Sequence, residues 1–199
     1  MELILVRHAR PEQIEDAEGP ANPPLTDIGH RQARAVASWL AGEHFDALYV
    51  SPMARALQTA EPLARLAGME AKVAHGVREY DADHVSYVPV EVIRQDKERW
   101  RAFLESEENL DRSHFISEVT STLEGIIEAH RGQRVVVFCH GGVINAWAAE
   151  TLGIGPRLFF DPDYTSINRF MAASSGERSI VSLNETAHLR GAADLRLYR

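Results

Sequence analysis

Three short apolar runs constrain the fold of this chain more than any other feature of its sequence. They occupy residues 3–6, 47–50 and 135–138, and every position in them is apolar. A strand that is apolar on both faces is typical of a parallel sheet with helices on both sides.

Helical patterns lie between these runs. We predict a helix over residues 26–41 with Thr26 as its N-cap, and a second that opens at Ser51-Pro52 and is kinked or interrupted at Pro62. Further helices are predicted over residues 117–130 and 141–152. The alternation of strands and helices predicts an α/β fold.

The end of the chain has a different pattern. Residues 166–171 and 179–183 flank a turn at residues 174–177, which predicts a C-terminal hairpin and an antiparallel edge on a mostly parallel sheet. No linker divides the chain, so we expect a single domain over residues 1–199.

Two stretches interrupt the alternation. Residues 11–25 contain four prolines and predict a loop. Residues 79–115 are charged and weakly periodic, and we expect them to form a cap or insertion over one end of the sheet, with a short helix near residues 90–104.

Composition excludes several classes of function. The chain has 29 Asp and Glu against 21 Lys and Arg, a net charge of −8, which makes it a poor non-specific binder of nucleic acid. Its single cysteine, Cys139, excludes an internal disulfide and a Cys-rich zinc site. The first residues match neither a signal peptide nor a membrane span, so we expect a cytoplasmic protein that is not bound to a membrane.

Polar residues follow each apolar run, at the end of a parallel sheet where ligands bind. They are Arg7 and His8 after the first run, Ser51 and Arg55 after the second, and His140 with Gly141-Gly142 after the third. Two guanidinium groups suit a phosphoryl group, and backbone N–H groups at a helix start can bind an anion. Imidazoles can act as nucleophile or donor, so the sequence predicts a phosphoryl site.

Other phosphate chemistries do not fit the sequence. It lacks a G-x-x-x-x-G-K-[ST] segment, which excludes a P-loop nucleotidase. A cysteine phosphatase needs an arginine about six residues after its cysteine, where this chain has Asn145. No paired aspartates follow the first run, so a histidine nucleophile without metal or cofactor is the remaining interpretation.

Four segments, in the same order, resemble the histidine phosphatase superfamily, which is also called phosphoglycerate-mutase-like. They are LVRHA at residues 5–9, LTDIGHRQA at 25–33, SPMARALQTA at 51–60 and FCHGG at 138–142. The resemblance runs from residue 3 to about residue 189 and implies a three-layer α/β/α fold and a phosphohistidine intermediate.

The resemblance also implies a role for each site residue. His8 would be the nucleophile, Arg7, Arg55 and His140 would hold the phosphoryl oxygens, and Glu79 would be the proton donor. Ser51 and the backbone of Gly141 are further candidate contacts to the substrate, although Ser51 is also the expected N-cap.

Two departures from the family pattern concern the reaction. Ala9 stands where the family usually has glycine, and Arg10-Pro11-Glu12-Gln13 replaces the run that mutase members carry. The second departure favours hydrolysis, and Arg10 would add a third positive charge near the substrate.

Several alternatives stay open at this point. Asp81, Asp83 and Glu91 compete with Glu79 as the acid, and His84 is a further candidate to point into the pocket. The competing functions are a phosphomutase, a catalytically silent protein that binds phosphorylated ligands, and a metal hydrolase built on the two histidines. The expected partner is a small phosphorylated substrate, and a homodimer is possible.

Overall fold

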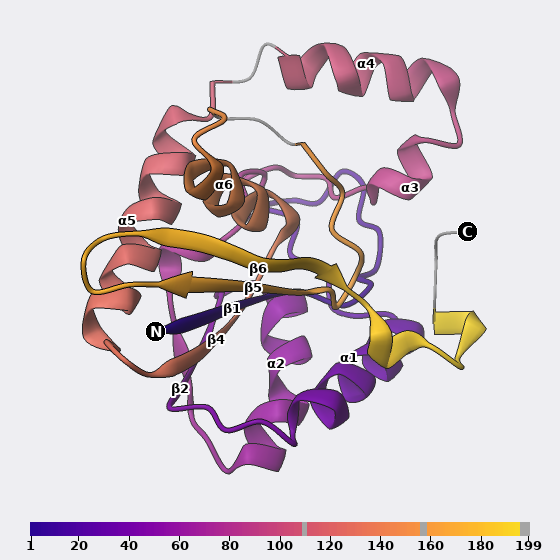
Figure 1. Ribbon diagram of the computed structural model, residues 1–199. Helices are drawn as coiled ribbons and strands as arrows, with labels where there is room; N and C mark the ends of the chain where they lie inside the picture. The colour runs from indigo at the N-terminus through magenta and orange to yellow at the C-terminus, as the bar shows by residue number, and fades with distance from the viewer. Residues whose placement is uncertain (109–110, 156–158, 196–199) are drawn as a thin grey trace.

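A six-stranded sheet forms the centre of the molecule in the computed structural model, which describes residues 1–108, 111–155 and 159–195 (Figure 1). In the order β3-β2-β4-β1-β5-β6, its strands are β3 (Ala71–Val73), β2 (Ala47–Val50), β4 (Arg134–Cys139), β1 (Glu2–Arg7), β5 (Ile167–Ala172) and β6 (Arg178–Glu185). The strands from β3 to β1 pair in parallel, whereas β5 pairs antiparallel with β1, and β6 pairs antiparallel with β5. The predicted mostly parallel sheet, its antiparallel edge and the C-terminal hairpin are therefore confirmed.

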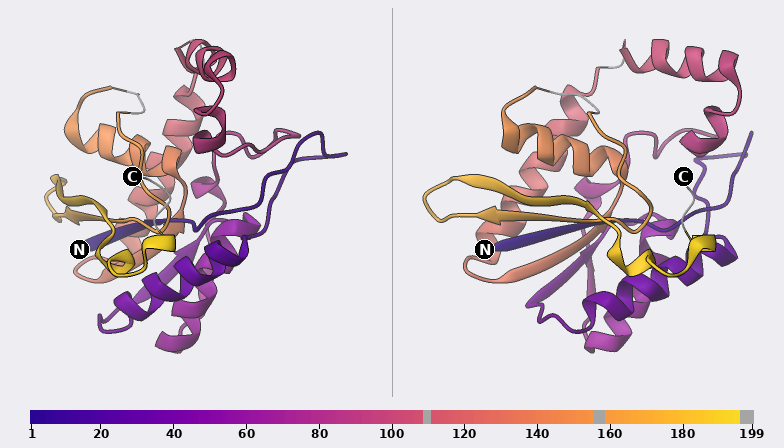
Figure 2. Two further views of the ribbon diagram at one scale, coloured as in Figure 1. Left: turned by 90° about the vertical axis from the view of Figure 1, so that its right-hand side faces the viewer. Right: turned by 45° about the vertical axis from the view of Figure 1, so that its right-hand side comes forward.

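Helices cover both faces of this sheet. The α-helices are α1 (Asp27–Leu40), α2 (Ala54–Ala67), α3 (Val90–Ile93), α4 (Lys97–Glu108), α5 (Ser113–Ala129) and α6 (Gly141–Leu152), and the 3-10 helices are η1 (His75–Val77), η2 (Ala187–Leu189) and η3 (Ala193–Leu195). Successive β1 residues alternate between two cores: Ile4 and Val6 pack with α1 and α2, and Leu3 and Leu5 with α5 and α6. The two pairs of helices lie on opposite faces of the sheet (Figure 2). The three-layer α/β/α architecture follows from this alternation.

The first helix begins as its sequence predicts. Thr26 has an extended backbone, and its hydroxyl accepts a hydrogen bond from the N–H of Gly29 at 2.9 Å. This bond satisfies one of the amide groups that the first helical turn leaves without a partner.

The second helix corrects the prediction at two points. It begins at Ala54 with Met53 at the N-cap, so Ser51 precedes the cap by two residues, and its side chain is hydrogen-bonded to His140. It also continues through Pro62 without interruption. Residues on both sides of the proline, Ala56 and Leu63, are buried against the sheet, and this packing offsets the backbone hydrogen bond that proline cannot donate.

Strand β3 has no counterpart in the sequence prediction. It contains only three residues, lies at the edge of the sheet and exposes 49% of Val73. A short, largely exposed strand lacks the apolar run by which the other strands are recognised.

Residues 90–104, predicted as one helix, belong to two helices. The carboxylate of Asp96 accepts hydrogen bonds from the N–H groups of Glu98 and Arg99, at 2.9 and 3.1 Å, and so starts α4 as a separate helix. Helix α4 stands away from the sheet, joined to it through α3 (Figures 1 and 2). None of the helices in the described ranges is both long and apolar enough to cross a membrane.

Candidate active site

Two histidine rings meet at the carboxyl ends of β1 and β4. The two strands are neighbours, with Arg7 opposite Cys139, so His8 and His140 leave the sheet side by side. Their ring centroids are 5.1 Å apart, and the backbone N–H of His8 donates to the carbonyl of Cys139 at 2.9 Å. The convergence that the sequence predicts at the strand ends is present in the structure.

The chemistry of His8 is set by its surroundings. Its Nδ1 lies 2.8 Å from the carbonyl oxygen of Ala9, and because a carbonyl only accepts, Nδ1 carries the proton. Burial first, and then the charges of Arg55 and Arg7, hold the pKa of His8 well below its usual value. The ring is therefore neutral, with a lone pair on Nε2 that is available for attack.

Arg55 is a fully buried cation from the first turn of α2. None of its guanidinium nitrogens has a hydrogen-bond partner among the described residues. Asp81 forms an ion pair with it at 3.7 Å, and the guanidinium lies 4.6 Å from the centre of the Tyr87 ring. Burying a guanidinium group without hydrogen bonds is costly unless a ligand supplies them.

Arg7 is held by the segment that precedes β5. Its guanidinium donates to the carbonyl of Pro162, forms an ion pair with Asp161 at 3.5 Å and lies over the ring of Tyr164 at 4.4 Å. The Tyr164 ring is also 5.7 Å from the ring of His8, so the arginine and the nucleophile candidate share one aromatic neighbour.

Glu79 reaches the same site from the loop after η1. Its carboxylate accepts hydrogen bonds from the N–H groups of Gly142, at 2.9 Å, and Tyr80, at 3.1 Å. Burial and the negative charge of Asp81 raise its pKa to about 7. Such a carboxyl group can give and take a proton near neutral pH.

The competing acids have other contacts. Asp81 pairs with the buried Arg55, whereas Asp83 forms a surface ion pair with Arg78 at 3.1 Å. Glu91, from α3, accepts a hydrogen bond from the hydroxyl of Tyr164 at 3.0 Å. Of the four carboxylates, Glu79 is therefore the one that is hydrogen-bonded to the helix that begins after His140.

The structure also places the remaining predicted residues. Ser51 is buried against His140, and a Cβ on Gly141 would stand 3.7 Å from Nε of Arg7. Arg10 is half-buried, and in the described ranges its guanidinium has no hydrogen-bond or ion-pair partner. His84 is exposed, and its backbone N–H donates to the carbonyl of Asp81 at 3.0 Å.

Sequence reasoning missed three residues of the site, Tyr87, Tyr164 and Asp161. Each lies in irregular backbone, outside any strand or helix pattern. An aromatic ring beside a guanidinium group has no spacing rule in the sequence, so no local signal identifies these contacts.

Two other chemistries lack support at this site. Burial raises the pKa of the Cys139 thiol, which keeps it protonated. No group of three His, Cys, Asp or Glu side chains within residues 1–108, 111–155 and 159–195 is placed to hold a metal ion.

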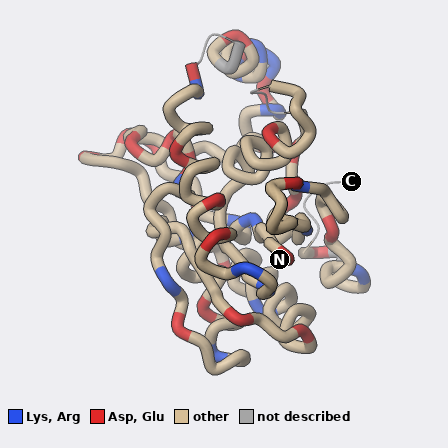
Figure 3. Tube along the Cα trace, turned by 60° about the vertical axis from the view of Figure 1, so that its left-hand side comes forward, with Lys and Arg blue, Asp and Glu red and all other residues tan. Residues whose placement is uncertain are grey.

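Charge around the rest of the molecule does not single out this site. Acidic and basic residues are interspersed along the trace (Figure 3), and the net charge is −8. The positive potential for a phosphoryl group therefore comes from the two buried arginines rather than from the whole surface.

The chain belongs to the histidine phosphatase superfamily, because the profile of branch 1 of that superfamily matches residues 3–186. Phosphoserine phosphatase 1 of Hydrogenobacter thermophilus is 28% identical over 199 residues, which cover 95% of this chain and 94% of that protein. Phosphoglycerate mutase-like protein 4 of Arabidopsis thaliana is 30% identical over 202 residues, which cover 94% of this chain and 86% of that protein.

A solved structure agrees with these sequence relatives. The crystal structure of phosphoserine phosphatase from Entamoeba histolytica in complex with 3-phosphoglyceric acid has a TM-score of 0.75 and 26% identity, and the match covers 94% of this chain and 98% of that one. With the family match, these relatives identify the chain as a phosphatase that hydrolyses phosphomonoesters.

Proposed function

We propose that the chain hydrolyses a small phosphomonoester through a phosphohistidine intermediate on His8, with Glu79 as the proton donor. The observation that carries the proposal is the pairing of a neutral His8, protonated on Nδ1, with a buried Arg55 whose guanidinium has no hydrogen-bond partner among the described residues. A phosphoryl group would accept the hydrogen bonds of the arginine and the electron pair of His8 Nε2.

In the first step, Nε2 of His8 attacks phosphorus while the bond to the ester oxygen breaks. Glu79 gives its proton to the departing alkoxide, which leaves as an alcohol. Arg7, Arg55 and His140 stabilise the charge on the phosphoryl oxygens, the main requirement in phosphoryl transfer.

In the second step, water attacks phosphorus and the bond from phosphorus to Nε2 breaks. The Glu79 carboxylate takes a proton from the water, which restores its starting form and releases phosphate. A pKa of about 7 suits a group that must act first as an acid and then as a base.

For the substrate, we propose a small phosphorylated metabolite of the size of phosphoserine. Support comes from the phosphoserine phosphatases among the relatives and from a neighbouring structure that holds 3-phosphoglyceric acid. The Arabidopsis relative carries a mutase-like name, so phosphate release and isomerisation of phosphoglycerate must be assayed side by side.

The central test is the His8→Ala variant. Rapid quenching of the wild-type protein with phosphoserine is expected to add one phosphoryl group to the chain, on His8, as measured by mass spectrometry. His8→Ala is expected to lose both the adduct and turnover, by ~10⁴-fold or more. A His8→Ala variant with full activity would refute the mechanism.

Two further measurements separate the alternative functions. Activity that survives an excess of chelator excludes the metal hydrolase, and its loss would point to a metal. A wild-type protein that binds vanadate but turns over no phosphomonoester in a broad panel would instead be a silent, ligand-binding member.

A further inference from the structure

Ser51 and His140 form a fully buried hydrogen bond beside the proposed phosphoryl site. Nε2 of His140 lies 2.8 Å from the hydroxyl oxygen of Ser51, and neither residue has exposed surface. The other ring nitrogen, Nδ1, is also buried, and no described residue is its hydrogen-bond partner. Nδ1 is therefore the atom of His140 that remains for a ligand.

The position of the His140 proton decides what that atom can do. Burial and the nearby positive charge of Arg55 hold the pKa of His140 well below its usual value, so the ring is neutral and has a single N–H. If Ser51 donates to Nε2, the N–H lies on Nδ1 and can donate to a phosphoryl oxygen. If Ser51 accepts from Nε2, Nδ1 presents a lone pair, which repels a phosphoryl oxygen.

The contacts of Ser51 favour the first arrangement. Its hydroxyl oxygen accepts a long hydrogen bond, of 3.4 Å, from the backbone N–H of Met53. Its own backbone N–H donates to the carbonyl of Phe138 at 2.9 Å, which fixes the residue between β2 and β4. Among the described residues, Nε2 of His140 is the acceptor within reach of the hydroxyl proton, so donation to Nε2 leaves no buried hydroxyl proton without a partner.

We propose that Ser51 is a positioning residue: it donates its hydroxyl proton to Nε2 of His140 and so holds that ring as a neutral Nδ1–H donor to the phosphoryl group. The inference rests on the proposed function, since it places the phosphoryl group beside His140. It replaces the sequence prediction that Ser51 caps a helix or contacts the substrate itself.

A double-mutant cycle tests the proposal through orthophosphate and vanadate binding, measured by calorimetry. Ser51→Ala is expected to weaken orthophosphate about tenfold, the loss of one hydrogen bond to a charged group. In a His140→Ala background, Ser51→Ala is expected to have no further effect, because Ser51 acts through the ring. Equal losses in the two backgrounds would overturn the proposal.

A spectroscopic measurement tests the same point without a ligand. The ¹⁵N spectrum of the His140 ring in the wild-type protein is expected to show the proton on Nδ1, and in Ser51→Ala to show this tautomer depleted. A wild-type proton on Nε2 would refute the assignment of Ser51. Failure of the wild-type protein to bind orthophosphate or vanadate would instead count against the proposed function, while the ring spectrum still decides the role of Ser51.

Discussion

Arginines at the two ends of the sheet have opposite surroundings. Toward the amino end of β1, Arg169 pairs with Glu2 at 3.1 Å and with Glu43, and Arg134 pairs with the same two glutamates. At the carboxyl end, Arg55 has only an ion pair at 3.7 Å and, within the described ranges, no hydrogen bond.

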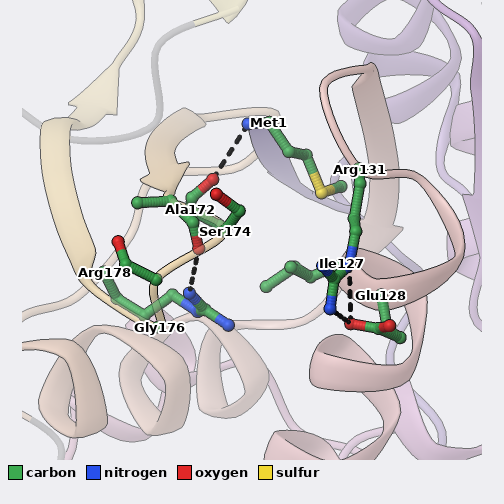
Figure 4. Close-up of a pocket in the computed structure, with 10 residues that line it drawn as sticks. Met1, Ile127, Glu128, Arg131, Ala172, Ser174, Gly176 and Arg178 are labelled. Atoms are coloured by element: carbon green, nitrogen blue, oxygen red, sulfur yellow. Dashed lines mark hydrogen bonds and ion pairs between the residues drawn. The ribbon is translucent and has the colours of Figure 1, made fainter.

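A pocket at the amino end extends the contrast. It encloses about 220 Å³ between Met1, the end of α5 and the hairpin (Figure 4). Its two arginines are both neutralised, Arg131 by Glu128 and Arg178 by Glu124. A cavity that contains arginines is therefore not by itself an anion site. A buried guanidinium group that lacks hydrogen-bond partners is a better indicator of where an anion binds.

The sharpest test of this contrast compares Arg55→Met with Arg169→Met. Arg55→Met is expected to lower kcat/KM by ~10³-fold or more, because it removes a cation from the phosphoryl site. Arg169→Met is expected to leave kcat/KM unchanged and to lower the free energy of unfolding by ~1–3 kcal/mol, since its glutamates lose their partner.

Thermal unfolding completes that test. Arg55→Met is expected to lower the free energy of unfolding less than Arg169→Met, because Arg55 has one long ion pair and no hydrogen bond among the described residues, whereas Arg169 contacts two glutamates at close range. Equal destabilisation by the two substitutions would show that both arginines are structural, and the contrast would fail.

Glutamates at the two ends provide the next comparison. Glu79→Gln is expected to lower kcat by ~10²–10⁴-fold, the usual contribution of acid–base catalysis, while orthophosphate binding is kept. Glu43→Gln, which weakens an ion-pair network at the opposite end, should change thermal stability and not kcat. An unchanged rate in Glu79→Gln would remove it from the mechanism.

Two helical glycines allow a smaller effect to be isolated. A Cβ on Gly142 would collide with Oε1 of Glu79, so Gly142→Ala is expected to displace the carboxylate and lower kcat ~10²-fold. Gly125 lies in α5 with open space around it, and Gly125→Ala should keep full activity while raising stability by ~0.5–1 kcal/mol. Similar kinetics for the two variants would contradict the proposed support of Glu79.

The pH profile gives the smallest expected change. The charge of Asp81 contributes to the raised pKa of Glu79, so Asp81→Asn is expected to lower that pKa. The acid must be protonated to act, and the basic limb of the kcat profile should therefore move to lower pH. Asp83→Asn, at an exposed ion pair with Arg78, is the control and should leave the limb in place.

The sequence allows the centre of the fold to be predicted better than its edges. Residues 3–6 and 135–138 are apolar because both faces of β1 and β4 are covered, and the polar residues after them meet because neighbouring parallel strands end together. Strand β3 escapes prediction because its exposed residues need not be apolar.

The site divides in the same way. His8, His140, Arg7 and Arg55 are predictable from their places after strands, whereas Tyr87 and Tyr164 depend on how irregular segments fold back over the arginines. Ser51 shows a related limit: its place before a helix resembles a cap, but its buried contact with His140 is formed only in the tertiary structure.

Helix α4 stands apart from the sheet, and none of residues 97–106 belongs to the two large apolar clusters. Substitutions along it therefore carry little thermodynamic penalty for the rest of the chain. The packing of the two cores therefore places little constraint on which side chains α4 carries.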